Sequence, residues 1–160
     1  MLANEIIPNL WLGNFQDSHS EPWINSFDII INCTKELPFC NQHLKNVRIP
    51  IDDNLETTEI DNMYKCLDMI TDFINIQLLK GKKILVHCFA GVQRSATVIV
   101  AYLVRYTGLS LNEAIKCVAS KRPIIFQPMC NFRPALDKFS DTYSIKKNNN
   151  IINKWDRIHQ

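Results

Sequence analysis

The chain has 160 residues, of which 46% are hydrophobic and 21% are charged, and its formal net charge is +2. These values fit one domain that buries a core without metals or disulfide staples, and they give no argument for binding to nucleic acid or a membrane. The first residues lack the pattern of a secretory signal, and the longest apolar run, Ala96 to Val104, is far shorter than the roughly 20 residues of a membrane-spanning helix. We therefore expect a protein of the cell interior, where thiols stay reduced.

The first half of the chain predicts short strands followed by a long helix. The strands are Ile6–Leu12 interrupted by Pro8, Asp28–Asn32, and Val47–Ile51 around Pro50. An apolar stripe at three- and four-residue spacing then predicts a helix, capped by Thr57 or Thr58 and ended by Gly81. Its members are Ile60, Met63, Leu67, Ile70 and Ile74. The run Lys83–Val86 predicts a short buried strand.

The second half predicts three helices. Ser95–Tyr106 is almost wholly apolar, as expected of a core helix, and ends before Gly108. Ser110 and Glu113 form a capping-box pattern for a helix reaching Lys121, and a last helix within 128–143 has Pro134 in its first turn or is kinked by it. The order of elements predicts an α/β fold, a central, mostly parallel, twisted sheet flanked by helices. We assign residues 1–145 to one domain and 146–160 to a polar tail or added helix.

The segment from His87 to Ser95 runs from a predicted buried strand directly into a buried helix. This geometry aims backbone N–H groups and the positive end of a helix dipole at one point, which makes an anion site. Gly91 allows the tight turn, and the guanidinium of Arg94 matches phosphate oxygens two at a time. Cys88 lies at the floor of the same site, where the field that holds an anion also favours a thiolate. Phe89, Ala90, Val92 and Gln93 complete the predicted substrate-binding loop.

These residues together predict nucleophilic catalysis without a metal or cofactor. A thiolate under a phosphate monoester can attack phosphorus and form a phosphocysteine, while Arg94 and the loop amides stabilise the equatorial oxygens. Ser95 can donate its hydroxyl to the sulfur when the intermediate is hydrolysed, and we expect His87 to order the loop rather than touch substrate. The alternative, a core cysteine followed by chance by a surface arginine, does not explain the flanking His, Ala-Gly and Ser.

The pattern His87-Cys88-x-Ala90-Gly91-x-x-Arg94-Ser95-Ala96-Thr97 resembles the signature of dual-specificity protein phosphatases, members of the cysteine-based tyrosine phosphatase superfamily. The resemblance runs from about residue 5 to residue 142, and the compact size is similar to that of catalytic-domain-only members, including viral ones. It implies the cysteine-phosphatase fold and activity on phosphotyrosine and phosphoserine or phosphothreonine in proteins.

The resemblance also implies a general acid. In the acid loop (residues 49–54), the acid stands three residues after the proline, which is Asp53, with the adjacent Asp52 as the alternative. Family members often have a Pro-Asn pair that helps to hold this loop. Here Met129 follows Pro128, so that support is missing or comes from Asn131.

The uncharged loop positions Phe89, Val92 and Gln93 favour phosphoprotein substrates over inositol lipids, which would need added cations. RNA 5′-ends rank second, because the related RNA phosphatases differ after the arginine, and a non-catalytic phosphoprotein-binding scaffold and a sulfurtransferase remain as alternatives. Cys33 ends a strand that should finish beside the loop, so it is either a buried packing residue or a redox partner of Cys88.

Overall fold

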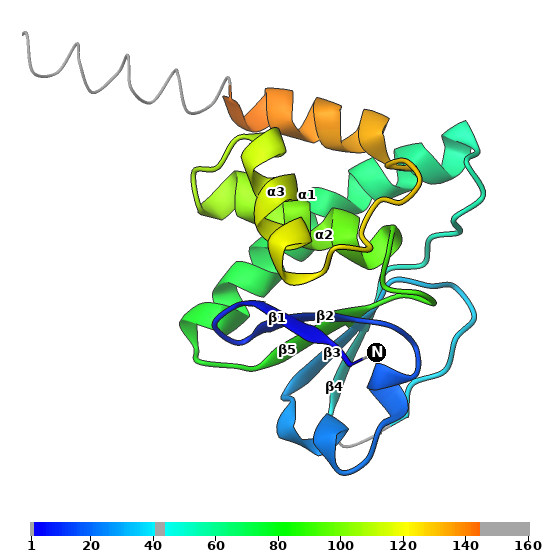
Figure 1. Ribbon diagram of the computed structural model, residues 1–160, viewed down its shortest axis with the longest axis vertical. Coiled ribbons are helices and arrows are strands. Elements are labelled where there is room, and N and C mark those ends of the chain that lie inside the picture. The colour runs from blue at the N-terminus through cyan, green and yellow to red at the C-terminus, as the bar shows by residue number, and fades with distance from the viewer. Residues whose placement is uncertain (1, 41–43, 145–160) are drawn as a thin grey trace, which may run out of the picture.

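The fold is built on one five-stranded sheet. The computed structural model describes residues 2–40 and 44–144 (Figure 1). The sheet has the order β1-β2-β5-β3-β4; β1 and β2 are antiparallel and the other neighbours are parallel. The strands are β1 (Asn4–Ile7), β2 (Leu10–Gly13), β3 (Ile29–Asn32), β4 (Lys45–Arg48) and β5 (Ile84–His87). The predicted α/β fold with a mostly parallel sheet is confirmed.

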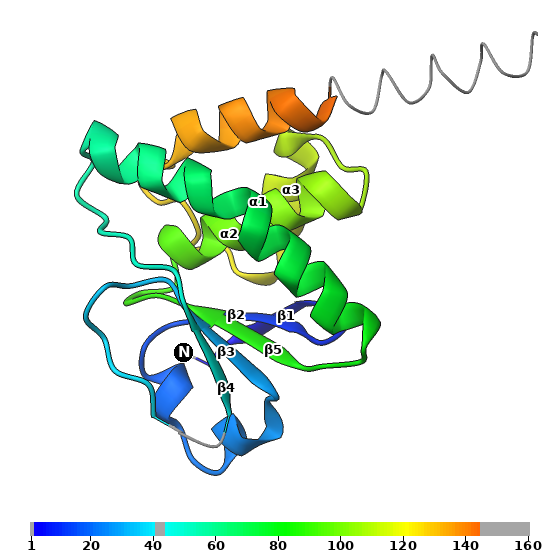
Figure 2. The same cartoon turned by 180° about the vertical axis from the view of Figure 1, so that it is seen from behind.

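The helices gather on one face of this sheet, as both views show (Figures 1 and 2). The other face is covered by two short 3-10 helices, η1 and η2. The helices are α1 (Thr57–Leu79), α2 (Arg94–Tyr106), α3 (Leu111–Lys121) and a further helix over 133–144; η1 spans Asp17–His19 and η2 spans Trp23–Ser26. No helix in the described part of the chain is long and apolar enough to cross a membrane.

The central strand β5 is buried on both faces because its side chains alternate between two cores. Ile84 and Val86 pack into the large core beneath the helices, whereas Leu85 points into a smaller core that includes Phe27 and the ring of Trp11. A strand covered on both faces reads as a continuous apolar run, which explains why the sequence shows no polar alternation here. This placement brings the carboxyl end of β5, at His87, to the middle of the sheet edge.

Two predicted strands have different limits in the structure. The run Ile6–Leu12 is a hairpin of two strands, because the chain turns at Pro8 and Asn9, whose φ is +70°. The strand predicted over Val47–Ile51 instead occupies Lys45–Arg48, in register with the whole of β3. It ends before Pro50, which has no N–H to continue the ladder.

The predicted cap of the long helix is wrong. The N-cap is Glu56, whose backbone is extended, so Thr57 and Thr58 already lie in the first helical turn and neither hydroxyl caps it. The predicted end is confirmed, because Gly81 follows the last turn with φ +75°.

The later helix signals are confirmed. Ser110 and Glu113 form the complete capping box of α3, with both reciprocal hydrogen bonds present. Gly108, with φ +76°, separates α2 from α3, and Pro134 lies in the first turn of the helix over 133–144. The segment 146–160, predicted to be a polar tail or added helix, lies outside the described residues.

Candidate active site

The loop that joins β5 to α2 forms a cradle of backbone N–H groups. We call residues 87–95 the cysteine loop. The carbonyls of residues 89, 90, 91 and 92 all accept hydrogen bonds from outside the loop, donated by the N–H of Phe15, by Arg122 and by the N–H of Phe126. In a trans peptide the carbonyl and the following N–H point in opposite directions. The N–H groups of residues 90–93 therefore turn toward the inside of the loop, as an anion site requires.

Gly91 makes this turn possible for two reasons. Its φ is +67°, a conformation that side chains disfavour. A Cβ at this position would lie 2.5 Å from the carbonyl oxygen of Gly13 and 2.7 Å from Nη2 of Arg122. No other residue fits there without moving backbone.

Arg122 braces the cysteine loop from behind, a role that the sequence analysis missed. Its side chain is fully buried, and Nε donates to the Gly91 carbonyl at 2.9 Å while Nη2 donates to the Ala90 carbonyl at 3.3 Å. Nη1 reaches Asn4 Oδ1 at 2.9 Å. Burial lowers the pKa of Arg122, although a guanidinium keeps its proton at any physiological pH. The brace therefore also puts a buried positive charge behind the loop.

Cys88 lies at the bottom of the loop and is only 2% exposed. Its Sγ is 3.1 Å from Oγ of Ser95, which is itself fully buried in the first turn of α2. A hydroxyl at this distance can donate to a thiolate and can stabilise a sulfur that leaves as an anion. The thiol and the hydroxyl that the sequence analysis singled out are thus in direct contact.

His87 is buried beneath the loop. Its Nδ1 donates to the carbonyl of Cys88 at 3.2 Å, and burial lowers the pKa of His87 to about 4. The ring is therefore neutral at physiological pH. This arrangement supports the predicted structural role.

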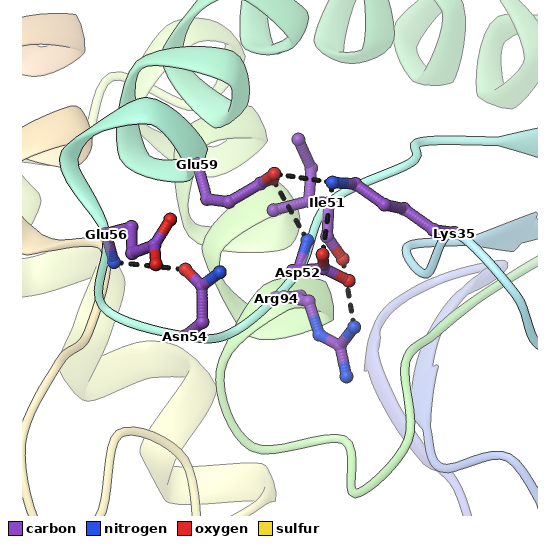
Figure 3. Close-up of polar contacts among 7 residues, drawn as sticks. All are labelled: Lys35, Ile51, Asp52, Asn54, Glu56, Glu59 and Arg94. Atoms are coloured by element: carbon purple, nitrogen blue, oxygen red, sulfur yellow. Dashed lines mark hydrogen bonds and ion pairs between the residues drawn. The ribbon is translucent and has the colours of Figure 1, made fainter.

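Arg94 connects the cysteine loop to the acid loop. Its Nη1 donates to the backbone carbonyl of Ile51 at 2.9 Å (Figure 3). Its Nε is buried and has no hydrogen-bond partner among the described residues. A bound phosphate would satisfy this donor, because a guanidinium fork uses two parallel N–H groups to bind two oxygens of one anion.

The Asp53 side chain is held by the segment before the last helix, on the other side of the acid loop from Arg94. Nδ2 of Asn131 donates to Oδ1 of Asp53 at 2.9 Å, so the support that was expected from a Pro-Asn pair is provided by Asn131. Gln93 fixes this segment in turn, donating to the Met129 carbonyl at 2.7 Å and accepting from the Asn131 N–H at 3.0 Å. The Gln93 side chain is thereby turned away from the cradle, which leaves only its backbone N–H to face an anion.

Asp52 has different partners from its neighbour. Its carboxylate lies 3.1 Å from Nζ of Lys35, and its N–H donates to Glu59 at 3.1 Å (Figure 3). Lys35 lies 2.5 Å from the Glu59 carboxylate as well. The Asp52 carboxylate is therefore occupied by a cation on the side of α1, whereas the Asp53 carboxylate is held by a neutral amide. These contacts favour Asp53 over Asp52 as the acid.

Comparison with known proteins agrees with this geometry. Residues 10–142 match the model of the dual specificity phosphatase catalytic domain. The chain belongs to this phosphatase family. It is similar to "Putative tyrosine phosphatase 123R" of Invertebrate iridescent virus 6, at 41% identity over 142 residues, with 87% of this chain and 92% of the viral protein covered.

Other members of the family are longer. This phosphatase is 30% identical to mouse dual specificity protein phosphatase 15 over 156 residues. The match covers 96% of the present chain but only 64% of the mouse protein. The crystal structure of DUSP15 superimposes with a TM-score of 0.77 at 30% identity, covering 87% of both chains. That of human DUSP28 gives 0.78 at 25% identity, covering 88% of this chain and 93% of the other. The predicted family and cysteine-phosphatase fold are confirmed.

Cys33 lies beside the loop of this phosphatase, where the sequence analysis placed it. Its N–H donates to the carbonyl of His87 at 2.8 Å, and its side chain is fully buried. Burial and the neighbouring Cys88 raise the pKa of Cys33 well above its ordinary value, so its thiol stays protonated. The structure contains it as a free cysteine, and its redox role stays a prediction.

The surface around the loop is uncharged on one side. Phe89 is 65% exposed and, with Ala90, lines a hollow of about 330 Å³ next to the loop. The other lining residues are Asn14, Phe15 and Gln16. Among residues 2–40 and 44–144, no group of three His, Cys, Asp or Glu side chains is arranged to hold a metal ion.

Proposed function

We propose that this phosphatase hydrolyses phosphotyrosine and phosphoserine or phosphothreonine in proteins through a phosphocysteine intermediate. The observation that carries the proposal is the contact of Cys88 Sγ with Ser95 Oγ at 3.1 Å, beneath a loop whose carbonyls at residues 89–92 accept hydrogen bonds from outside it. The nucleophile, its hydrogen-bond donor and the anion cradle then converge on one point.

In the first step the Cys88 thiolate attacks phosphorus, forming a sulfur–phosphorus bond as the ester phosphorus–oxygen bond breaks. Asp53 gives its proton to the leaving oxygen, and Arg94 with the loop N–H groups stabilises charge on the three equatorial oxygens. In the second step Asp53 accepts a proton from water as the water oxygen attacks phosphorus. The sulfur–phosphorus bond breaks, Ser95 stabilises the departing thiolate, and inorganic phosphate is released.

Protein substrates are favoured by the rim of the site. Phe89 and Ala90 are exposed next to the cradle and carry no charge, and the Gln93 side chain is hydrogen-bonded to the Met129 carbonyl. A phosphoinositide brings further phosphates, which call for nearby cations. An apolar rim instead suits the residues that flank a phosphorylated side chain.

The test is hydrolysis of para-nitrophenyl phosphate with no added metal, followed by peptides phosphorylated on Tyr, Ser or Thr. We expect Cys88→Ser to abolish turnover and Asp53→Asn to lower kcat about 100-fold or more. Cys117→Ser, at a half-buried cysteine of α3, is the matched control and should retain activity. Hydrolysis of triphosphorylated RNA ends but not of phosphopeptides would instead support the RNA alternative, and binding of phosphopeptides without turnover would support a scaffold.

A further inference from the structure

Glu59 is the third residue of α1, but it does not make the bond usual for an acid at that position. Such an acid normally accepts the N–H of the helix N-cap residue. Here the N–H of the N-cap, Glu56, is taken by Oδ1 of Asn54 at 3.0 Å. Oε2 of Glu59 instead accepts the N–H of Asp52 at 3.1 Å, seven residues earlier in the chain (Figure 3). The helix acid is therefore directed back onto the acid loop.

Lys35 occupies the second oxygen of this carboxylate. Its Nζ lies 2.5 Å from Oε1 of Glu59 and 3.1 Å from Oδ2 of Asp52, so one ammonium joins both acids. Glu59 is only 6% exposed, and a carboxylate buried to this degree is retained only when it is paired and hydrogen-bonded. The Lys35 hydrogen bond lowers the pKa of Glu59, so the pair is ionised at neutral pH.

The contacts fall on three successive residues of the acid loop. Arg94 holds the carbonyl of Ile51, Glu59 holds the N–H of Asp52, and Asn131 holds the carboxylate of Asp53. The three partners come from α2, from α1 and from the segment before the last helix. The Ile51 carbonyl and the Asp52 N–H belong to one peptide unit, so Arg94 and Glu59 together hold the peptide that leads into Asp52, the residue before the proposed acid.

We infer that Glu59, together with Lys35, is a positioning pair for the general acid: it holds Asp53 within reach of the leaving oxygen without touching substrate. The inference rests on the proposed function, in which Asp53 is the acid. A positioning role predicts that the loss of kcat depends on the acidity of the leaving group. A weakly acidic leaving group needs a proton in the transition state, whereas a strongly acidic one leaves without it.

The experiment compares phenyl phosphate with an aryl phosphate whose phenol is strongly acidic, such as the difluorinated umbelliferyl ester. For Glu59→Gln we expect kcat to fall about 10- to 100-fold on phenyl phosphate, the range seen when a group is misplaced by about 1 Å. The fall on the activated ester should be much smaller. Lys35→Met, at a half-exposed side chain, should give the same pattern with a smaller amplitude. The double variant Glu59→Gln/Asp53→Asn should be no slower than Asp53→Asn alone, because the two changes remove one function.

Glu113→Gln is the matched control, since Glu113 is also the third residue of its helix but completes the capping box with its own N-cap, Ser110. It reports the general cost of losing an acid from a first helical turn. Inhibition by orthovanadate should be equal in all variants and shows that the cysteine loop remains intact. Equal losses on both esters, or losses that multiply in the double variant, would overturn the inference. A wild type inactive on both esters would instead contradict the proposed function itself.

Discussion

Acidification should destabilise this protein through His87. The ring is fully buried, and its pKa is lowered from the ordinary 6.5 to about 4. Between these values the unfolded chain binds a proton that the folded protein excludes. The free energy of unfolding therefore keeps its full value above pH 6.5 and decreases as pH falls toward 4. At 1.36 kcal/mol per pKa unit the difference amounts to about 3 kcal/mol in total, of which about 2 kcal/mol is lost by pH 5.

Urea unfolding at pH 7.5 and pH 5.0 measures this loss. A change of about 2 kcal/mol corresponds to a shift of about 1 M in the urea midpoint. His87→Asn is the informative comparison, because the amide still offers an N–H to the Cys88 carbonyl but cannot titrate. All other ionisable groups are shared, so the difference between the two pH dependences isolates His87. If wild type and variant lose the same stability on acidification, the argument from burial is wrong.

Three further changes test the architecture of the loop. Gly91→Ala should destabilise the protein by about 1–3 kcal/mol from backbone strain alone and abolish vanadate binding, because the new Cβ meets the Gly13 carbonyl at 2.5 Å; a binding assay with unchanged affinity would contradict this. Arg122→Met should cost about 3 kcal/mol in urea unfolding, since it orphans the buried carbonyls of Gly91 and Ala90, whereas a change below about 0.5 kcal/mol would show that the brace is dispensable. Phe89→Ala should raise KM about fivefold for a phosphopeptide, equivalent to about 1 kcal/mol of contact, and raise it less for para-nitrophenyl phosphate; equal rises would show that the rim does not contact the peptide.

The features predicted correctly from the sequence are those specified by residues close together in the chain. The capping box of α3 spans four residues, and the cysteine loop has its cysteine, glycine, arginine and serine within eight positions. The strand before the loop and the core helix after it were evident from apolar composition alone. Local signals of this kind define where the loop begins and ends, because strand, turn and helix follow one another without interruption.

Residues that support the loop from a distance carry no such signal. Arg122 stands thirty-one residues beyond the Gly91 carbonyl that it binds, and an arginine at the end of a helix is ordinarily explained by the helix dipole. Gln93 shows the same limit. Its place inside the motif predicts contact with substrate, but the motif does not indicate that its side chain binds the Met129 carbonyl and leaves only the backbone N–H to face an anion. Only the packing of α3 and of that segment against the loop decides either role.

The choice between Asp52 and Asp53 shows why adjacency in sequence cannot settle a catalytic assignment. The two carboxylates differ by one position, and successive extended residues point in different directions. Asp52 meets Lys35, seventeen residues earlier, while Asp53 meets Asn131, seventy-eight residues later. An ammonium stabilises the charged carboxylate, whereas an amide donor orients a carboxyl without adding a charge. The proposed assignment to Asp53 therefore depends on contacts from three distant parts of the chain, because Asn131 binds the Asp53 carboxylate, Lys35 binds that of Asp52, and Glu59 accepts the Asp52 N–H.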